Sequence, residues 1–187
     1  IGLCWVGLPG VASAQVPRIK GQGTAASAMG NAFAAQADDP SALHYNPAGM
    51  TQLQGIQFMA GALFSGGSTN FTSLTGVTAR GDRNGSAAWP PPGHTFITAN
   101  LKDLGLTALG DLTAGIGLTV PFGSLTRWPS DGPFRTATTF NTLPLLDIKP
   151  SLAYKATENL SLGLGADIYT FSGLVGEGHV EKQSVWP

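Results

Sequence analysis

Two segments of this chain alternate strictly between apolar residues and small or polar residues. In residues 112–120 and 160–168 the even-numbered positions are apolar, and the odd-numbered positions are Gly, Ser, Thr or Asp. Successive side chains of a β-strand point to opposite faces, so each segment predicts a strand with one apolar and one polar face. The loops between such strands are too polar to cover the apolar faces. The pattern therefore favours an antiparallel sheet whose apolar side meets lipid.

The composition agrees with a membrane-embedded sheet. Charged residues make up 11% of the 187 residues, well below the roughly 25% of a soluble domain. The 26 glycines are about twice the usual share. No stretch approaches the ~18–20 consecutive apolar residues of a membrane helix. The net charge of −1 gives no reason to expect a nucleic-acid partner.

The N-terminus has the features of a secretory signal. Residues 1–11 are apolar, and Ala12-Ser13-Ala14 matches the small-x-small cleavage pattern. We therefore expect residues 1–14 to be a truncated signal peptide and the chain to be a fragment. A buried N-terminal strand of a soluble protein is the alternative. Cys4 is the only cysteine and lies in this segment, so the mature chain offers no disulfide or thiolate.

Residues 15–52 lack the alternation. Residues 24–36 are Ala-rich and predict a short helix, and Asp39-Pro40 predicts the N-cap and first position of a second one. Asn46-Pro47 should end that helix. The region is too small to fold alone and must pack against something larger.

From residue 55 the period changes to two. Two long loops, residues 66–93 and 123–142, alternate with two shorter turns, the asymmetry of outer-membrane barrels. Aromatic residues near strand ends would form the interfacial girdles; they are Phe122, Trp128, Tyr154, Tyr169 and Phe171. Gly163 and Gly165 should relieve crowding on the inner face. The expected strands are residues 56–65, 94–101, 112–122, 143–155 and 160–175.

Several motifs occur in the order found in one known family. Asn46, Pro47 and Ala48 form a triplet within residues 37–50, and residues 115–123, 147–155 and 160–165 follow it. Together they resemble the FadL-type outer-membrane transporters of long-chain fatty acids and hydrocarbons (OMPP1/FadL/TodX). The resemblance spans residues 20–175.

This resemblance implies an all-β fold, a transmembrane antiparallel β-barrel with an N-terminal lumen plug that contains short helices. Family members have 14 strands, of which this chain would hold about the first five. The implied domains are a signal peptide (1–14), a plug or hatch (15–52) and barrel strands (53–187). Asn46, Pro47 and Ala48 would lie in the plug.

The resemblance also implies an inward kink of the third strand that opens a lateral exit. In this chain the exit would fall within residues 112–122, where Gly115 and Gly117 weaken the strand and Pro121 cannot donate a ladder hydrogen bond. Backbone groups freed at membrane depth need partners in protein or in a cavity. We expect the plug to supply them, with the Asn46 amide as a candidate.

A carboxylate head group would need an Arg or Lys nearby. Lys149 on the inner face of the fourth strand, and Arg127 or Arg135 in the second loop, are available. Alternatively, Lys149 pairs with Asp147 or another inner charge. The histidines His44, His94 and His179 lack metal-ligand spacing, and no serine lies in a nucleophile elbow. We expect no catalytic site, no metal and no cofactor.

The sequence thus predicts passive uptake of hydrophobic compounds across a bacterial outer membrane. The partners would be a fatty acid or hydrocarbon and outer-membrane lipid, and the protein would be a monomer and not an enzyme. One alternative is a non-specific or structural porin-like barrel. Another is a soluble secreted β-protein, in which Leu118, Ile148 and Leu162 would be enclosed.

Overall fold

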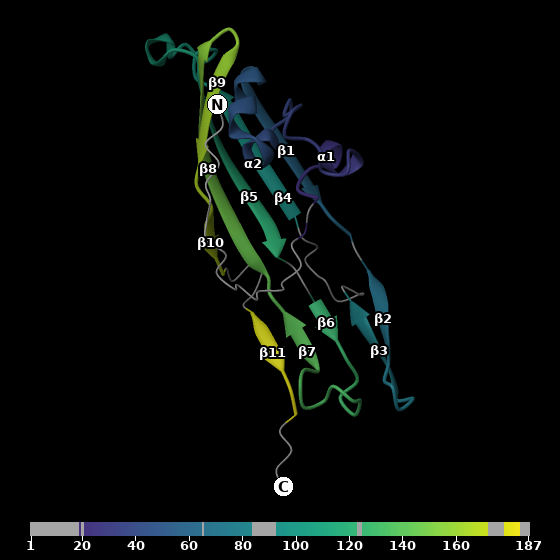
Figure 1. Ribbon diagram of the computed structural model, residues 1–187. Helices are drawn as coiled ribbons and strands as arrows, with labels where there is room; N and C mark the ends of the chain where they lie inside the picture. Colours follow the sequence, from purple (N-terminus) through teal and green to yellow (C-terminus); the bar gives the residue numbers. More distant parts are fainter. Residues whose placement is uncertain are drawn as a thin grey trace, which may run out of the picture.

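The computed structural model describes residue 19 and residues 21–64, 66–83, 93–122, 125–171 and 178–183. Their strands form two open antiparallel sheets that follow one another along the long axis of the molecule (Figure 1). We call them the proximal and the distal sheet. The helices of the N-terminal segment (residues 21–54) lie against the proximal sheet.

The proximal sheet contains the strands that alternation predicts. Its strand order is β1-β4-β5-β8-β10, and β9 also pairs with β8. Strands are therefore confirmed within all five predicted ranges, although residues 172–175 of the last one lie outside the described residues. The bounds are β1 (Ile56–Ala62), β4 (Gly93–Asn100), β5 (Leu112–Phe122), β8 (Leu145–Thr157), β9 (Leu160–Gly165) and β10 (Ile168–Thr170).

Strands β9 and β10 keep one register against β8. Ser151 lies opposite Gly165, and Ile148 lies opposite Ile168, so the pairing continues past the interruption at residues 166 and 167. The interruption faces Pro150, which has no N–H to donate to the ladder. The predicted fifth strand is thus one strand with a weak point.

The distal sheet corrects the prediction of two long loops. Polar segments within residues 66–93 and 123–142 form strands in the order β11-β7-β6-β3-β2. Residues 84–92, including the Trp-Pro-Pro-Pro run, lie outside the described residues. The strands are rich in Thr, Ser, Asn and charged residues and lack an apolar face, so periodicity did not reveal them. They are β2 (Gly67–Thr72), β3 (Thr78–Arg83), β6 (Leu125–Arg127), β7 (Phe140–Thr142) and β11 (His179–Glu181).

The two sheets have matching connectivity. Along the chain β2 follows β1, β3 precedes β4, β6 follows β5, and β7 precedes β8. With β11 following β10, the distal order repeats the proximal order strand by strand. The distal sheet is therefore a continuation of the same hairpins beyond the apolar band.

The N-terminal segment contains three short helices, α1 (Thr24–Ala28), α2 (Ala42–Tyr45) and η1 (Pro47–Gln52). The helix predicted over residues 24–36 is too long, because Gly30 and Asn31 adopt left-handed φ values of 62° and 68°. Ser41, and not Asp39, occupies the N-cap of α2. The Asp39 carboxylate instead accepts hydrogen bonds from the Ser41 N–H and hydroxyl at 2.8 and 2.6 Å.

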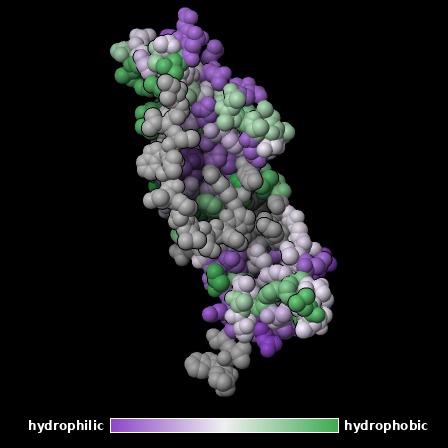
Figure 2. Space-filling view, viewed as in Figure 1, coloured by the Kyte–Doolittle hydropathy of each residue, from purple (hydrophilic) through white to green (hydrophobic). Residues whose placement is uncertain are grey.

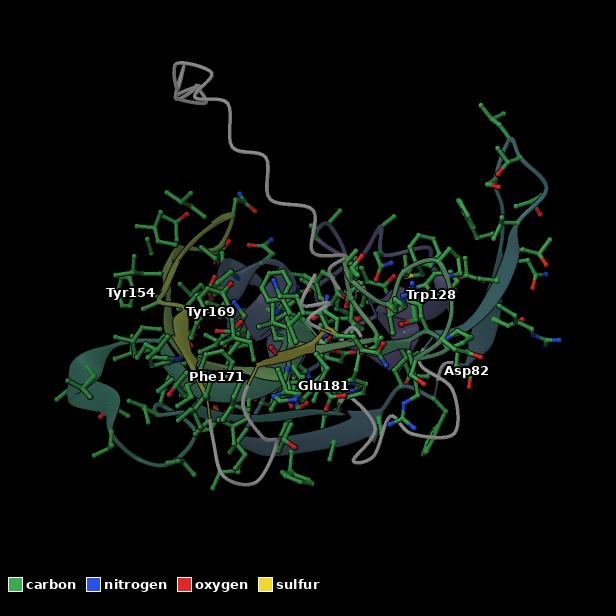
Figure 3. The ribbon with its side chains drawn as sticks, turned by 90° about the horizontal axis from the view of Figure 1, so that it is seen from below. Asp82, Trp128, Tyr154, Tyr169, Phe171 and Glu181 are labelled. Atoms are coloured by element: carbon green, nitrogen blue, oxygen red, sulfur yellow. The ribbon has the colours of Figure 1, made fainter. Side chains whose placement is uncertain are left out.

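The main core lies between the N-terminal segment and the concave face of the proximal sheet, as Figure 3 shows end-on. Residues from both sides are buried together there, so the segment does pack against a larger partner. None of the helices in the described ranges is both long and apolar enough to cross a membrane. The core residues are Ala37, Ala42, Leu43, Met50, Leu53, Phe96 and Ala153, with Met59 packed beside them.

The convex face of the proximal sheet is apolar and exposed. Register aligns Phe58, Ile97 and Ile116 in one row across β1, β4 and β5, and all three are exposed. Leu118 and Leu162 are 41% and 56% exposed, so no second layer formed by the described residues encloses them. This exposure disfavours the soluble alternative. The 11 residues of β5, at ~3.4 Å each and a tilt of ~40–45°, cross the ~25 Å of an outer-membrane apolar band.

The aromatic girdle is only partly as predicted. Tyr154 lies on the convex face, opposite Leu112 and Leu162. Tyr169 lies opposite the buried Asp147 and therefore faces the concave side, where its ring is 6.1 Å from that of Phe122. Trp128 packs on Phe134 at 4.4 Å in the distal part. A register shift between Thr119 and Phe122 explains why Phe122 does not continue the convex row.

The turn between β4 and β5 contains the short helix η2 (Thr107–Leu109). Lys102 lies 3.2 Å from Asp111, and the Asn100 amide donates to the same carboxylate. The Asn100 hydrogen bond and then Lys102 lower the pKa of Asp111, so this turn is held by a charged carboxylate.

Candidate functional site

The concave face of the proximal sheet carries small and polar side chains. They gather in the hollow of this face, where Figure 2 shows hydrophilic atoms. Most are buried under the N-terminal segment, and η1 contacts β5, β8 and β9. The candidate site is therefore the contact between this segment and three neighbouring strands. Its buried polar members on β5 and β8 include Thr113, Thr119, Asp147, Lys149 and Ser151, and Thr98 and Asn100 lie beside them on β4.

Glycines of β5 form a seat for the N-terminal segment. A Cβ placed on Gly115 would lie 2.7 Å from Leu43 and 3.1 Å from Met50, and one on Gly117 would lie 2.9 Å from both Leu43 and Phe96. Leu43 and Met50 are almost fully buried. Gly115 and Gly117 thus serve a close approach here, within a part of β5 that stays in register with β4 and β8.

The Asn-Pro-Ala triplet lies at the junction of α2 and η1 and contacts β9. A Cβ on Gly163 would approach the Ala48 nitrogen to 2.2 Å and the Pro47 carbonyl carbon to 2.6 Å, so only glycine fits under this backbone. The Thr51 and Ser161 hydroxyls are hydrogen-bonded at 2.8 Å. Pro47 occupies the first position of η1, and Gly163 relieves crowding as predicted.

The Asn46 amide does not reach β5, so that hypothesis is wrong. Asn46 Nδ2 donates to the Ala34 carbonyl at 2.9 Å and closes the N-terminal segment on itself. The free backbone groups at the end of β5 do have a partner from near the N-terminus, but this partner is a backbone N–H group. The Ile19 N–H donates to the Pro121 carbonyl at 2.7 Å.

Pro121 lies where β5 loses its regular pairing. Thr119 pairs with Asp147 and Phe122 with Leu145, which is a shift of one residue and marks a bulge around Val120 and Pro121. Pairing between β4 and β5 covers Thr113–Thr119. The irregular end of β5 is therefore the Pro121 end and not the Gly115–Gly117 stretch.

Lys149 is buried between two carboxylates. Its ammonium lies 3.3 Å from Asp147 Oδ2 and forms an ion pair with Asp167 across the strand boundary. This is the alternative arrangement that we considered for Lys149. Asp147 is fully buried and accepts weakly from Thr119 at 3.5 Å, while its Oδ1 has no hydrogen-bond partner among the described residues. Asp167 was not singled out from the sequence, although its odd position in the alternating segment places it on this face.

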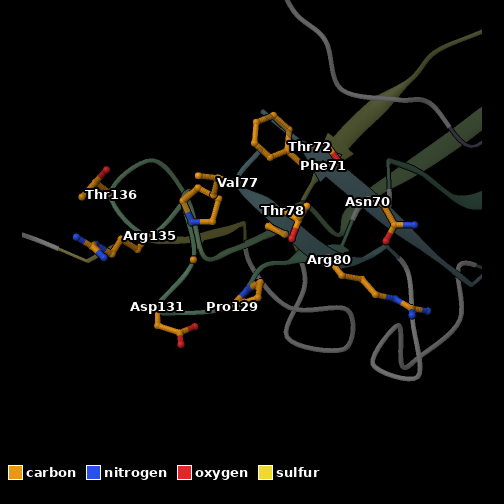
Figure 4. A pocket seen from close by; sticks show the side chains of 13 residues that line it. Asn70, Phe71, Thr72, Val77, Thr78, Arg80, Pro129, Asp131, Arg135 and Thr136 are labelled. Atoms are coloured by element: carbon orange, nitrogen blue, oxygen red, sulfur yellow. The ribbon is translucent and has the colours of Figure 1, made fainter. Parts of the chain in front are cut away.

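Arg127 and Arg135 lie in the distal part and do not join Lys149. The Arg127 guanidinium is 5.3 Å from the ring centroid of Phe140. Arg135 lines a pocket of about 900 Å³ between the β2–β3 hairpin and residues 129–136 (Figure 4). Arg80 and Asp131 line it too, so the pocket is amphipathic and contains both charges.

Comparisons with known proteins agree with this architecture. The model of the family "Outer membrane protein transport protein (OMPP1/FadL/TodX)" matches residues 5–183. A protein of Neisseria meningitidis serogroup B named "Putative outer membrane protein NMB0088" is 32% identical over 120 residues, which are 61% of this chain and 24% of that protein. The chain therefore spans about a quarter of the length of this relative. No solved structure matches the chain. With an exposed apolar face, an N-terminal segment seated on the opposite face and a family match over nearly its whole length, this chain belongs to the OMPP1/FadL/TodX family of outer membrane transport proteins.

Proposed function

We propose that the protein admits hydrophobic compounds, such as long-chain fatty acids or aromatic hydrocarbons, through the bacterial outer membrane by passive diffusion. The distal sheet would face the outside. The N-terminal segment would act as a plug in the lumen, and substrate would leave sideways. No covalent chemistry is required, so the protein would not be an enzyme.

One observation carries this proposal. The same sheet is apolar and exposed on its convex face and covered by the N-terminal segment on its concave face. Lipid would solvate the first face, because antiparallel strands in a bilayer present apolar residues outward. The second face would enclose a plugged lumen. A porin-like barrel without a ligand would not require Gly115, Gly117 and Gly163 to receive a plug so closely.

The lateral exit at the third strand is supported by the bulge at Pro121. The freed carbonyl of Pro121 is held by Ile19, which precedes the N-terminal segment in the chain, so movement of this part of the chain would release it. The plug residues Asn46, Pro47 and Ala48 belong to the N-terminal segment: Asn46 is hydrogen-bonded to Ala34, and Pro47 and Ala48 contact Gly163 of β9. A shift of the plug would therefore be transmitted to the wall.

Affinity would come mainly from burying the apolar chain of the substrate. Each methylene contributes about 0.8 kcal/mol, so few polar contacts are needed. A carboxylate could be met at the distal end by Arg135 or Arg127. In the lumen it could be met by Lys149, if it replaced one of the two aspartates that Lys149 now contacts.

Uptake measurements test the proposal. The protein is expressed in cells that lack their own fatty-acid transporter, and uptake of radiolabelled oleate and toluene is followed over a concentration series. We expect saturable uptake above the background of empty cells, with no entry of a hydrophilic dye of similar size. Uptake that rises linearly for all solutes, the dye included, would support the porin-like alternative and contradict the proposal.

A further inference from the structure

The ladder between β8 and the β9–β10 strand has a gap at one residue pair. The register places Pro150 opposite Ala166. The Ala166 N–H donates to the Pro150 carbonyl at 3.1 Å, so this is a hydrogen-bonded pair that normally exchanges two bonds. Pro150 has no N–H, and the return bond to the Ala166 carbonyl cannot form.

The fifth strand has little side-chain bulk at this gap. Gly163, Gly165 and Ala166 follow one another on the β9 side with one intervening leucine. By contrast, pairing between β4 and β5 runs through seven consecutive residues. On β8 the gap lies near the middle of the strand, and therefore near the middle of the apolar band. We call this boundary between Pro150 and residues 165–167 the β8–β9 seam.

Two contacts close the seam from the concave side. On one side of Pro150, Lys149 on β8 forms its ion pair with Asp167 directly across the boundary. On the other side, η1 lies over both strands, with Pro47 and Ala48 on Gly163 and Thr51 bonded to Ser161. The plug residues and the ion pair thus flank the ladder position at Pro150, which lacks a bond.

We propose that the β8–β9 seam is a second lateral exit, closed by the Lys149–Asp167 ion pair and by η1. This inference rests on the proposed uptake function. An apolar molecule that leaves here enters the bilayer at the depth of its hydrocarbon core. A substrate with a carboxylate group would bind Lys149 and displace Asp167. The ion pair across the seam would then be broken as the plug shifts.

A disulfide across the seam tests this exit. Ser151 and Gly165 are direct partners on the concave face, and a Cβ on Gly165 would lie 2.6 Å from Ser151 Oγ. They neighbour the hydrogen-bonded pair and so belong to the closely spaced type that suits a disulfide. The variant Ser151→Cys/Gly165→Cys is made in a Cys4→Ser background. The matched control is Ala60→Cys/Thr95→Cys, a direct pair between β1 and β4 on the convex face.

Uptake of oleate and toluene is measured in proteoliposomes with each pair oxidised and then reduced. We expect oxidation of the 151–165 pair to lower uptake about threefold or more, with recovery on reduction, because a gated step limits transport. The control pair should give equal rates in both states. Equal rates for the oxidised and reduced 151–165 pair would overturn the inference. If the reduced protein itself shows no saturable uptake, the proposed function fails instead.

A second variant addresses the ion pair separately. Asp167→Asn keeps the shape and removes the charge that ties Lys149 to the fifth strand. We expect faster uptake than in the unmodified protein, and no change for Asp82→Asn at an exposed position of β3. Unchanged uptake in Asp167→Asn would show that the ion pair does not hold the seam.

Discussion

Lys149 shows how strongly a single buried charge depends on its neighbours. It is 7% exposed and contacts Asp147 on its own strand and Asp167 on the next one. Because Asp147 is fully buried with one oxygen unpaired, its negative charge is compensated chiefly by Lys149. Removing one partner of a buried pair leaves an uncompensated charge, which costs more than the pair contributes.

We therefore expect Lys149→Met to destabilise the folded protein by about 3–5 kcal/mol. Lys155→Met, at an exposed position of the same strand, should change stability by less than about 0.5 kcal/mol. The heat-modifiable shift in gel migration, followed over temperature, measures both. Asp147→Asn combined with Lys149→Met should recover much of the loss. Equal behaviour of the two single variants would contradict the burial of this charge.

At the scale of elements, the contact between η1 and β9 depends on one missing side chain. The backbone of Pro47 and Ala48 occupies the space that a Cβ of Gly163 would need. The helix is short and has no capping hydrogen bond from a side chain. Its position is therefore set by the strand beneath it.

Gly163→Val should displace η1 while leaving the strand intact, because valine suits a β-strand but cannot fit under this backbone. We expect the N-terminal segment to loosen, with faster proteolysis of this segment and a free energy of unfolding lower by about 1–3 kcal/mol. The control is Gly67→Val, a strand glycine of β2 with open space around it. Limited proteolysis followed by mass spectrometry distinguishes them. Identical cleavage patterns would mean that Gly163 does not seat the helix.

At the scale of the whole molecule, the two faces of the proximal sheet face different surroundings. The convex face is exposed although it carries leucine, isoleucine and phenylalanine, and we expect lipid to be its solvent, as in outer-membrane barrels. The turn between β4 and β5 lies beyond the strands, and we expect it to meet water. Replacing a leucine of the convex face with a charged residue should therefore cost more free energy than the same replacement of an equally exposed leucine in this turn.

Leu118→Arg on the convex face of β5 should impair membrane insertion by about 2–4 kcal/mol if it lies near the bilayer centre. Leu104→Arg in the turn is the matched control, since Leu104 is 48% exposed and Leu118 is 41% exposed. It should be nearly neutral. Folding into lipid vesicles over a denaturant series gives both free energies. A comparable loss for both variants would place the convex face in water.

Much of this architecture was predictable because alternation is a local property. The even and odd positions of residues 112–120 and 160–168 fix which side chains share a face, whatever the strand pairs with. The break at Asn46-Pro47 and the need for room at Gly163 also follow from the chemistry of single residues. The distal strands were not predicted, because polar segments without an apolar face show no periodic pattern of hydrophobic residues.

Only the tertiary structure decided which groups meet. The alternation in the sequence places Lys149, Asp167 and Gly163 on one face of the sheet. It does not show that the Lys149 ammonium contacts Asp167, or that the backbone of Pro47 and Ala48 lies on Gly163. The sequence could require a partner for the Pro121 region, but it suggested Asn46 where the chain uses the Ile19 N–H. The period of two within a strand determines on which face of the sheet a side chain lies. Contacts between distant segments depend on strand register and on the packing of the N-terminal segment, and no local sequence pattern contains that information.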